Sequence, residues 1–264
     1  MKLGEVQTLK IERQLDQGIY LSDGDTQVLL PKNEVTSDMN INDEISVFIY
    51  RDSEDRLVAT TTTPLLTLGE VALLKVKDVT SIGAFLDWGL AKDLLLPFKE
   101  QTTKVNNGDE VLIALYIDKT NRLCGTMKVY NYLNTKSPYQ KDNVVTGTIY
   151  EIIDNFGAFV AVDDRYSGLI PKKEIFTPIK VGDSIEARVT RVQNDGKLDL
   201  SLRKKAHLQI DIDGDMIFEK LSHSPSGFLP YHDKSSSDEI KKIFSISKNA
   251  FKRAIGHLQK QGKI

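Results

Sequence analysis

The sequence predicts a mainly β protein with an α-rich C-terminal domain, in which three tandem five-stranded barrels precede a small helical domain. Two observations lead to this expectation. One residue pattern occurs three times along the 264-residue chain, and a helical pattern replaces it after residue 205. Internal repetition is the signature of repeated structural units, so it determines the fold class before local propensities do.

Four sets of residues take corresponding places in the three copies. A glycine opens each copy, a second glycine lies in its middle, a proline follows two apolar residues, and a basic residue begins the last strand. The offsets are 65 or 66 residues from the first copy to the second, and mostly 74 or 75 from the second to the third. The sets are Gly4, Gly69 and Gly147; Gly18, Gly83 and Gly157; Pro31, Pro97 and Pro171; and Arg56, Arg122 and Lys197.

Each copy has the pattern of short β-strands. Apolar and polar residues alternate, as in residues 185–190, and turn residues follow at short intervals. Five short strands at this spacing favour a small closed barrel, because closure leaves no exposed sheet edge. The middle glycine is expected to serve a bulge or a tight strand bend. The predicted barrels are residues 1–63, 64–135 and 136–205.

Residues 206–264 follow a helical pattern. Ser236 and Glu239 match a capping box, and Ser247 is placed to cap a last helix with apolar residues on one face. Three helices are expected, with a short strand over 227–234 after the first, and this order predicts a winged-helix, or helix-turn-helix, domain. The chain stops where a wing hairpin would begin, so we expect a truncated wing. Residues 211–215 are expected to form a helix-capping turn, because they lack the glycine and glutamate of a calcium loop.

Composition excludes several classes. The lone Cys124 excludes a disulfide framework, and four scattered histidines give no metal-binding spacing. The longest apolar run, residues 111–117, is far short of the ~20 residues that span a bilayer, and the N-terminus does not resemble a signal peptide. We therefore expect a cytoplasmic protein without a membrane partner. We expect no metal, no cofactor and no enzymatic activity, since no catalytic constellation stands out.

The charge is uneven although its net value is only −2. Residues 1–63 hold 6 basic and 12 acidic residues, the next copy is neutral, and residues 136–205 and 206–264 each carry +2. Residues 248–263 contain five basic residues and no acid. Attraction for phosphate should therefore fall on the C-terminal half, and the first copy is the least suited to bind a polyanion.

The strongest candidate site is a pair of aromatic residues in the third copy. Phe156 and Phe159 are three residues apart, and a bulge at Gly157 would bring both onto one surface as a stacking platform for single-stranded bases. The second copy retains only Phe85, with Ile82 in the other place, and the first has Gln17 and Tyr20. The cations expected around the platforms are Lys172, Lys173, Arg188, Arg191, Lys197 and Arg122.

Three functions remain open at this point. One is binding of single-stranded RNA by the barrels. A second is binding of DNA through the last helix, whose polar face carries Lys248, Lys252 and Arg253. A third is an interaction scaffold on the ribosome or with RNA-processing proteins such as a nuclease complex, which the acidic first copy favours.

The third copy resembles the RNA-binding OB-fold of ribosomal protein S-one type, on residues 147–162, 168–175, 181–192 and 197–203. The resemblance implies an RNA face that uses two aromatics, here Phe156 and Phe159, and an acidic–basic pair. The basic member matches Lys197, Arg122 and Arg56. The acidic member matches Asp118 and Asp52 but is Gln193 in the third copy, and the family's histidine is replaced by Pro31, Pro97 and Pro171.

Three such copies followed by a winged helix are similar to the conserved virulence factor B family of Gram-positive bacteria. This resemblance covers essentially the whole chain, including residues 227–240 and 247–264. It implies a cytoplasmic, non-enzymatic RNA-binding protein that regulates gene expression after transcription, including the expression of virulence genes.

Overall fold

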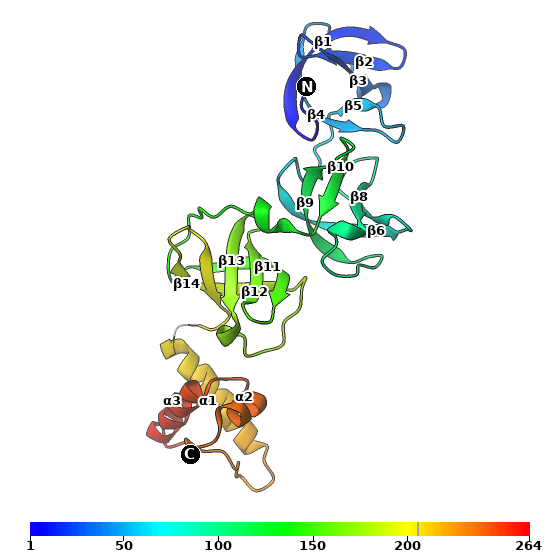
Figure 1. The fold of residues 1–264 in the computed structure, drawn as a ribbon. Helices are drawn as coiled ribbons and strands as arrows, with labels where there is room; N and C mark the ends of the chain where they lie inside the picture. The colour runs from blue at the N-terminus through cyan, green and yellow to red at the C-terminus, as the bar shows by residue number, and fades with distance from the viewer. Residues whose placement is uncertain (205) are drawn as a thin grey trace. The chain divides into compact units, whose positions relative to one another are not determined.

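The computed structural model describes residues 1–204 and 206–264, and it contains three five-stranded β-barrels followed by three helices (Figure 1). The fold class predicted from the repeats is therefore confirmed. The chain divides into two compact units. One comprises residues 1–134 with 164–166, and the other comprises residues 135–163 with 167–264. The expected boundary between 205 and 206 touches the one residue outside the described ranges.

Barrel 1 is closed by hydrogen bonds in the strand order β1-β2-β3-β5-β4. The first strand pairs with both β2 and β4, because a register shift between Ile11 and Arg13 bends it around the barrel. Leu21, Leu30 and Ile49 are among the buried side chains that fill its interior. The strands are β1 (Val6–Leu15), β2 (Gly18–Ser22), β3 (Gln27–Pro31), β4 (Glu44–Arg51) and β5 (Leu57–Thr60).

Barrel 2 has the corresponding strands in a five-stranded sheet of order β10-β9-β6-β7-β8 that hydrogen bonds do not close, although its edge strands β8 and β10 lie against each other. Its register shift falls at the equivalent place, between Val76 and Asp78. The strands are β6 (Val71–Val79), β7 (Gly83–Asp87), β8 (Leu94–Pro97), β9 (Glu110–Ile117) and β10 (Leu123–Thr126).

Barrel 3 is closed in the order β11-β12-β13-β15-β14, with the register shift between Ile149 and Glu151. The strands are β11 (Val144–Ile153), β12 (Gly157–Val162), β13 (Tyr166–Pro171), β14 (Ser184–Val192) and β15 (Leu198–Ser201). A short 3-10 helix follows the third strand of every barrel: η1 (Lys32–Glu34), η2 (Phe98–Glu100) and η4 (Lys172–Glu174), while η3 (Val129–Tyr132) follows barrel 2.

The expectation that Gly147 opens the third copy was wrong. Gly4 and Gly69 precede their barrels with φ of +80° and +82°, and each donates its N–H to the strand beside it. In barrel 3 this place belongs to Asp142, with φ of +75°, which donates its N–H to the carbonyl of Val189. Aspartate tolerates the left-handed region better than most residues, so glycine is not required there. Gly147 instead lies inside β11.

The helical domain contains α1 (Ala206–Ser222), α2 (Ser237–Phe244) and α3 (Lys248–Lys260). Both predicted caps are confirmed: Ser236 forms the full capping box with Glu239, and the side chain of Ser247 accepts from the N–H of Ala250. Helices α2 and α3 bury Phe244 and Phe251 against α1.

Two expectations for the tail were wrong. Residues 211–215 form no capping turn but lie in the middle of α1, where a Cβ on Gly214 would be in van der Waals contact with Leu258 of α3, at 3.6 Å. Tertiary packing against α3 thus outweighs the low helix propensity of this segment. Residues 227–234 form no strand, since no second strand lies beside them in the described part of the domain.

Candidate nucleic-acid interface

Phe156 is presented to solvent by a turn that only glycine permits. Gly157 has φ of +130°, and a Cβ built on it would lie 2.0 Å from the carbonyl oxygen of Ile170. This close approach lets the carbonyl of Phe156 accept a 2.9 Å hydrogen bond from the N–H of Lys172. Hydrogen bonds hold the backbone N–H and carbonyl of Phe156, yet its side chain is 62% exposed, which is unusual for a phenylalanine. Gly18 and Gly83 make the same close approach in the other barrels.

The expectation of a bulge at Gly157 was wrong. The register shift lies on β11, between Ile149 and Glu151, and Gly157 is the first residue of β12, paired with Ile153. Phe156 escapes strand alternation because it lies in the turn before β12. Phe159 is the half-buried residue among buried ones on that strand, and its ring centroid is 6.2 Å from that of Tyr150.

Two cations lie directly beside this turn. Lys172 and Lys173 are both exposed on η4. The acid of the same short helix, Glu174, turns inward, because its carboxylate accepts a 2.8 Å hydrogen bond from the hydroxyl of Ser201. The equivalent Glu34 and Glu100 bond Thr60 and Thr126 in the same way. In barrel 3 this arrangement leaves the lysines as the outward charges of η4.

The remaining predicted cations of barrel 3 differ in availability. Arg191 is exposed opposite Asp199. Lys197 forms a 2.8 Å ion pair with Asp195, and this contact holds the pKa of Asp195 below its usual value. Arg188 was expected among the cations around the platform, but its side chain is only 21% exposed and its Nη1 lies 2.9 Å from Asp142. Arg188 is therefore held in a structural ion pair.

The acidic–basic pair implied by the resemblance takes a different form in each barrel. In barrel 1, Arg56 donates to Asp52 at 2.6 Å, as the pattern suggests. In barrel 2, Asp118 accepts from Thr120, and Arg122 reaches out of its own barrel to Asp55. In barrel 3, the side chain of Gln193 donates to Asp199 at 2.6 Å, and Lys197 pairs with Asp195.

The aromatic position also differs among the barrels. Tyr20 in barrel 1 is covered by Arg13, whose guanidinium carbon is 4.5 Å from the ring centroid. Phe85 in barrel 2 is half-buried and lines a pocket at the joint with barrel 1. Of these repeat-equivalent aromatic positions, Phe156 of barrel 3 is the most exposed.

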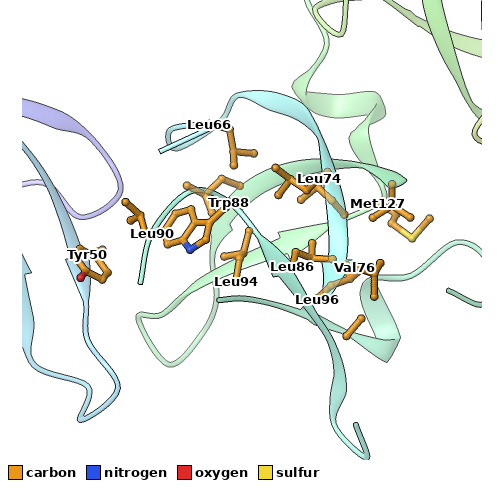
Figure 2. Close-up of a cluster of buried hydrophobic side chains, with 14 of the residues drawn as sticks. Tyr50, Leu66, Leu74, Val76, Leu86, Trp88, Leu90, Leu94, Leu96 and Met127 are labelled. Atoms are coloured by element: carbon orange, nitrogen blue, oxygen red, sulfur yellow. The ribbon is translucent and has the colours of Figure 1, made fainter. Parts of the chain in front are cut away.

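Barrels 1 and 2 are joined by a shared apolar cluster, of which Figure 2 shows the part around Trp88. Phe48 and Tyr50 of barrel 1 have ring centroids 5.8 Å and 6.5 Å from that of Trp88, both edge-on. Figure 2 shows Tyr50 beside Leu90 and Trp88. Sequence reasoning missed this joint, and the single tryptophan of the chain was the one signal that could have drawn attention to it.

The last helix carries its cations on the face away from the core. Lys252 and Arg253 are exposed, and Lys248 is half-exposed, with its Nζ 3.5 Å from the carbonyl of Lys234. The opposite face buries Phe251 and Leu258. The helix therefore offers a cationic surface.

Among the described residues, no cluster of three or more histidine, cysteine, aspartate or glutamate side chains could hold a metal ion. No helix in those residues has the length and apolarity to cross a membrane.

This fold and surface define a class of protein in which tandem S1-type nucleic-acid-binding barrels precede a winged-helix domain. Residues 3–62 and 68–128 match the model of the S1 domain, and residues 139–203 match that of the S1 RNA binding domain. Residues 215–264 match the CvfB-like winged helix domain.

The chain belongs to the conserved virulence factor B family. Conserved virulence factor B of Staphylococcus aureus (strain N315) is 32% identical over 273 residues, covering 98% of this chain and 90% of the relative. The YitL protein of Bacillus subtilis (strain 168) is 33% identical over 275 residues, covering 100% and 91%. A crystal structure of a multidomain protein with nucleic acid binding domains from Streptococcus pneumoniae TIGR4 has a TM-score of 0.51 at 27% identity, covering 99% and 95%.

Proposed function

We propose that this protein is a non-enzymatic, single-stranded RNA-binding protein that acts in the cytoplasm as a post-transcriptional regulator, with virulence genes among its targets. The observation that carries the proposal is the exposed Phe156 ring, held by Gly157 beside Lys172 and Lys173. An exposed aromatic beside cations suits single strands, because a base stacks on the ring while the lysines attract the adjacent phosphates.

The remaining proposed contacts extend this surface. Phe159 adds a second ring and Arg191 a second cationic position on barrel 3. In the helical domain, Lys252 and Arg253 provide phosphate contacts that carry no sequence information. Lys197 and Arg188 contribute less, because both are already engaged with carboxylates.

The test is fluorescence anisotropy of the intact chain with labelled single-stranded RNA, single-stranded DNA and duplex DNA, at low and moderate salt. We expect RNA binding that weakens with salt and little duplex binding. Phe156→Ala should weaken RNA binding by roughly 5- to 150-fold, the equivalent of 1–3 kcal/mol of lost stacking. The matched control is Phe228→Ala, which removes a 66% exposed ring from the loop before α2.

Two results contradict the proposal. Duplex preference would assign the function to DNA binding through α3. Absence of binding to every nucleic acid would favour a protein scaffold on the ribosome or in an RNA-processing complex.

A further inference from the structure

A pocket of about 240 Å³ opens where barrel 1 meets barrel 2. Its floor is apolar, since Tyr50, Trp88 and Leu94 are all buried. Ile82, which is 59% exposed, and the half-buried Phe85 also line it. The volume is below the roughly 300–1,000 Å³ of pockets that enclose a drug-sized molecule, so it suits one planar group with a small substituent.

The charged groups of this pocket leave an excess of positive charge. Of its two acids, Asp55 lies 3.2 Å from Arg122 and Asp93 lies 2.7 Å from Lys77. Each carboxylate is thus matched by a cation. Arg51 and Lys92 also line the pocket, and the hydrogen bonds they make do not neutralise them.

Both of these cations donate to backbone carbonyls across the joint. The Nε of Arg51 lies 3.1 Å from the carbonyl oxygen of Asn121, and the Nζ of Lys92 lies 2.6 Å from that of Asp52. A carbonyl is a dipole without net charge, so these bonds position the cations while their positive charge still attracts an anion. Among the ion pairs of the described residues, neither cation has a carboxylate partner.

We infer that this pocket binds one nucleotide, with its base against Phe85 and Ile82 and its phosphate beside Arg51 and Lys92. An apolar and aromatic bed next to two positive charges complements a planar base attached to an anionic phosphate. The inference rests on the proposed function where the nucleotide belongs to an RNA strand. It also gives the first unit a binding role that the acidic charge of barrel 1 did not predict.

Trp88 provides a direct probe of this pocket, because it is the single tryptophan of the chain and lies in the pocket wall. The experiment titrates the full chain with uridine monophosphate and, separately, with a short single-stranded RNA, while recording tryptophan fluorescence. We expect a saturable change with the mononucleotide and with the RNA. A response to the mononucleotide alone supports a site for free nucleotides, and a response to RNA alone supports a site for a nucleotide within a strand.

Charge variants test the assigned phosphate position. Arg51→Gln combined with Lys92→Gln should weaken the fluorescence titration by about tenfold or more, because two charge-assisted contacts are lost. The matched control is Lys10→Gln combined with Lys75→Gln, which removes the same charge from exposed positions on β1 and β6. If the first pair of substitutions unfolds the joint, Ile82→Asp at the exposed mouth should abolish the response without disturbing the core.

The test of this pocket can fail independently of the test of the proposed function. RNA binding by anisotropy with no Trp88 response to either probe would overturn the nucleotide pocket and leave the proposed function standing. A Trp88 response to uridine monophosphate without RNA binding by anisotropy would support the pocket and contradict the proposed function. Phe156→Ala should weaken RNA binding by anisotropy but leave the mononucleotide response of Trp88 unchanged.

Discussion

The Nη2 of Arg122 in barrel 2 lies 3.2 Å from the Oδ2 of Asp55 in barrel 1. Its repeat equivalent Arg56 pairs instead with Asp52 in its own turn. Equivalent residues of the repeat therefore have different roles, and the difference arises from the neighbouring barrel. Both members of the Arg122–Asp55 pair are exposed, and such pairs contribute at most about 1 kcal/mol. The joint must then depend mainly on its apolar cluster.

Tyr50→Ala should loosen this joint. Tyr50 is 8% exposed and packs edge-on against Trp88, so its removal leaves a cavity between the barrels. Large-to-small substitutions of buried aromatics cost about 3–5 kcal/mol. We expect a lower urea midpoint for the first unit and a red shift of Trp88 emission as water reaches the indole. Tyr20→Ala, at a half-buried position outside the cluster, is the control. Unchanged Trp88 emission in Tyr50→Ala would contradict this account of the joint.

Gly157→Ala should destabilise barrel 3 by more than the backbone conformation alone requires. An L-residue in the left-handed region costs about 1–2 kcal/mol, and here the added Cβ also lies 2.0 Å from the carbonyl oxygen of Ile170. Gly182→Ala is the matched control, because Gly182 also has positive φ but has open space around its Cβ position. Hydrogen exchange of residues 157–171 measures the difference. Equal protection in the two variants would show that the close approach is not required.

Sequence patterns could predict the repeat because each barrel needs the same local devices. The glycines that begin β2, β7 and β12 and the prolines that end β3, β8 and β13 make their contacts within one barrel. The exposure of Phe156 likewise depends on contacts within barrel 3. The position of the bulge and the opening residue of barrel 3 could not be predicted, because Asp142 and Gly147 can each satisfy more than one backbone role.

Contacts between side chains far apart in the sequence could not be predicted for a different reason. Arg122, Arg188 and Arg203 look alike as surface cations in the sequence, and only the fold shows which carboxylate each one meets. For the same reason, the sequence alone predicts a turn for the acids of residues 211–215. Asp213 is in fact buried on α1, with its carboxylate bonded to Arg203 and to the side chain of Gln209.

Asp213→Ala should strongly destabilise the packing of α1. Asp213 is 3% exposed, and its removal leaves the partly buried guanidinium of Arg203 without its carboxylate. Breaking a buried ion pair by removing one partner costs about 3–5 kcal/mol. Thermal unfolding and hydrogen exchange of residues 209–222 measure this loss.

Two controls separate the buried pair from charge in general. Asp215→Ala removes an exposed acid from the same helix, 3.8 Å from Lys263, and should change stability by less than about 1 kcal/mol. Asp213→Leu combined with Arg203→Met should recover most of the stability, because an apolar pair leaves no buried charge. A double variant as unstable as Asp213→Ala would show that the helix needs the charges themselves.

Cys124 should resist alkylation in the folded protein. Burial raises the pKa of its thiol to about 11, so at pH 8 only about one molecule in a thousand carries the reactive thiolate. The side chain is also only 3% exposed. We expect iodoacetamide to modify the native chain slowly and the urea-unfolded chain fully, as measured by intact mass.

Raising the pH from 8 to 9 separates the two causes of this resistance, which are the raised pKa of the thiol and its burial. A tenfold faster native reaction would mean that the pKa alone limits reactivity, whereas a rate equal to that of unfolding would mean that the thiol reacts only when barrel 2 opens. We expect the second result, because Cys124 sits on β10 opposite Tyr116, under the joint with barrel 1.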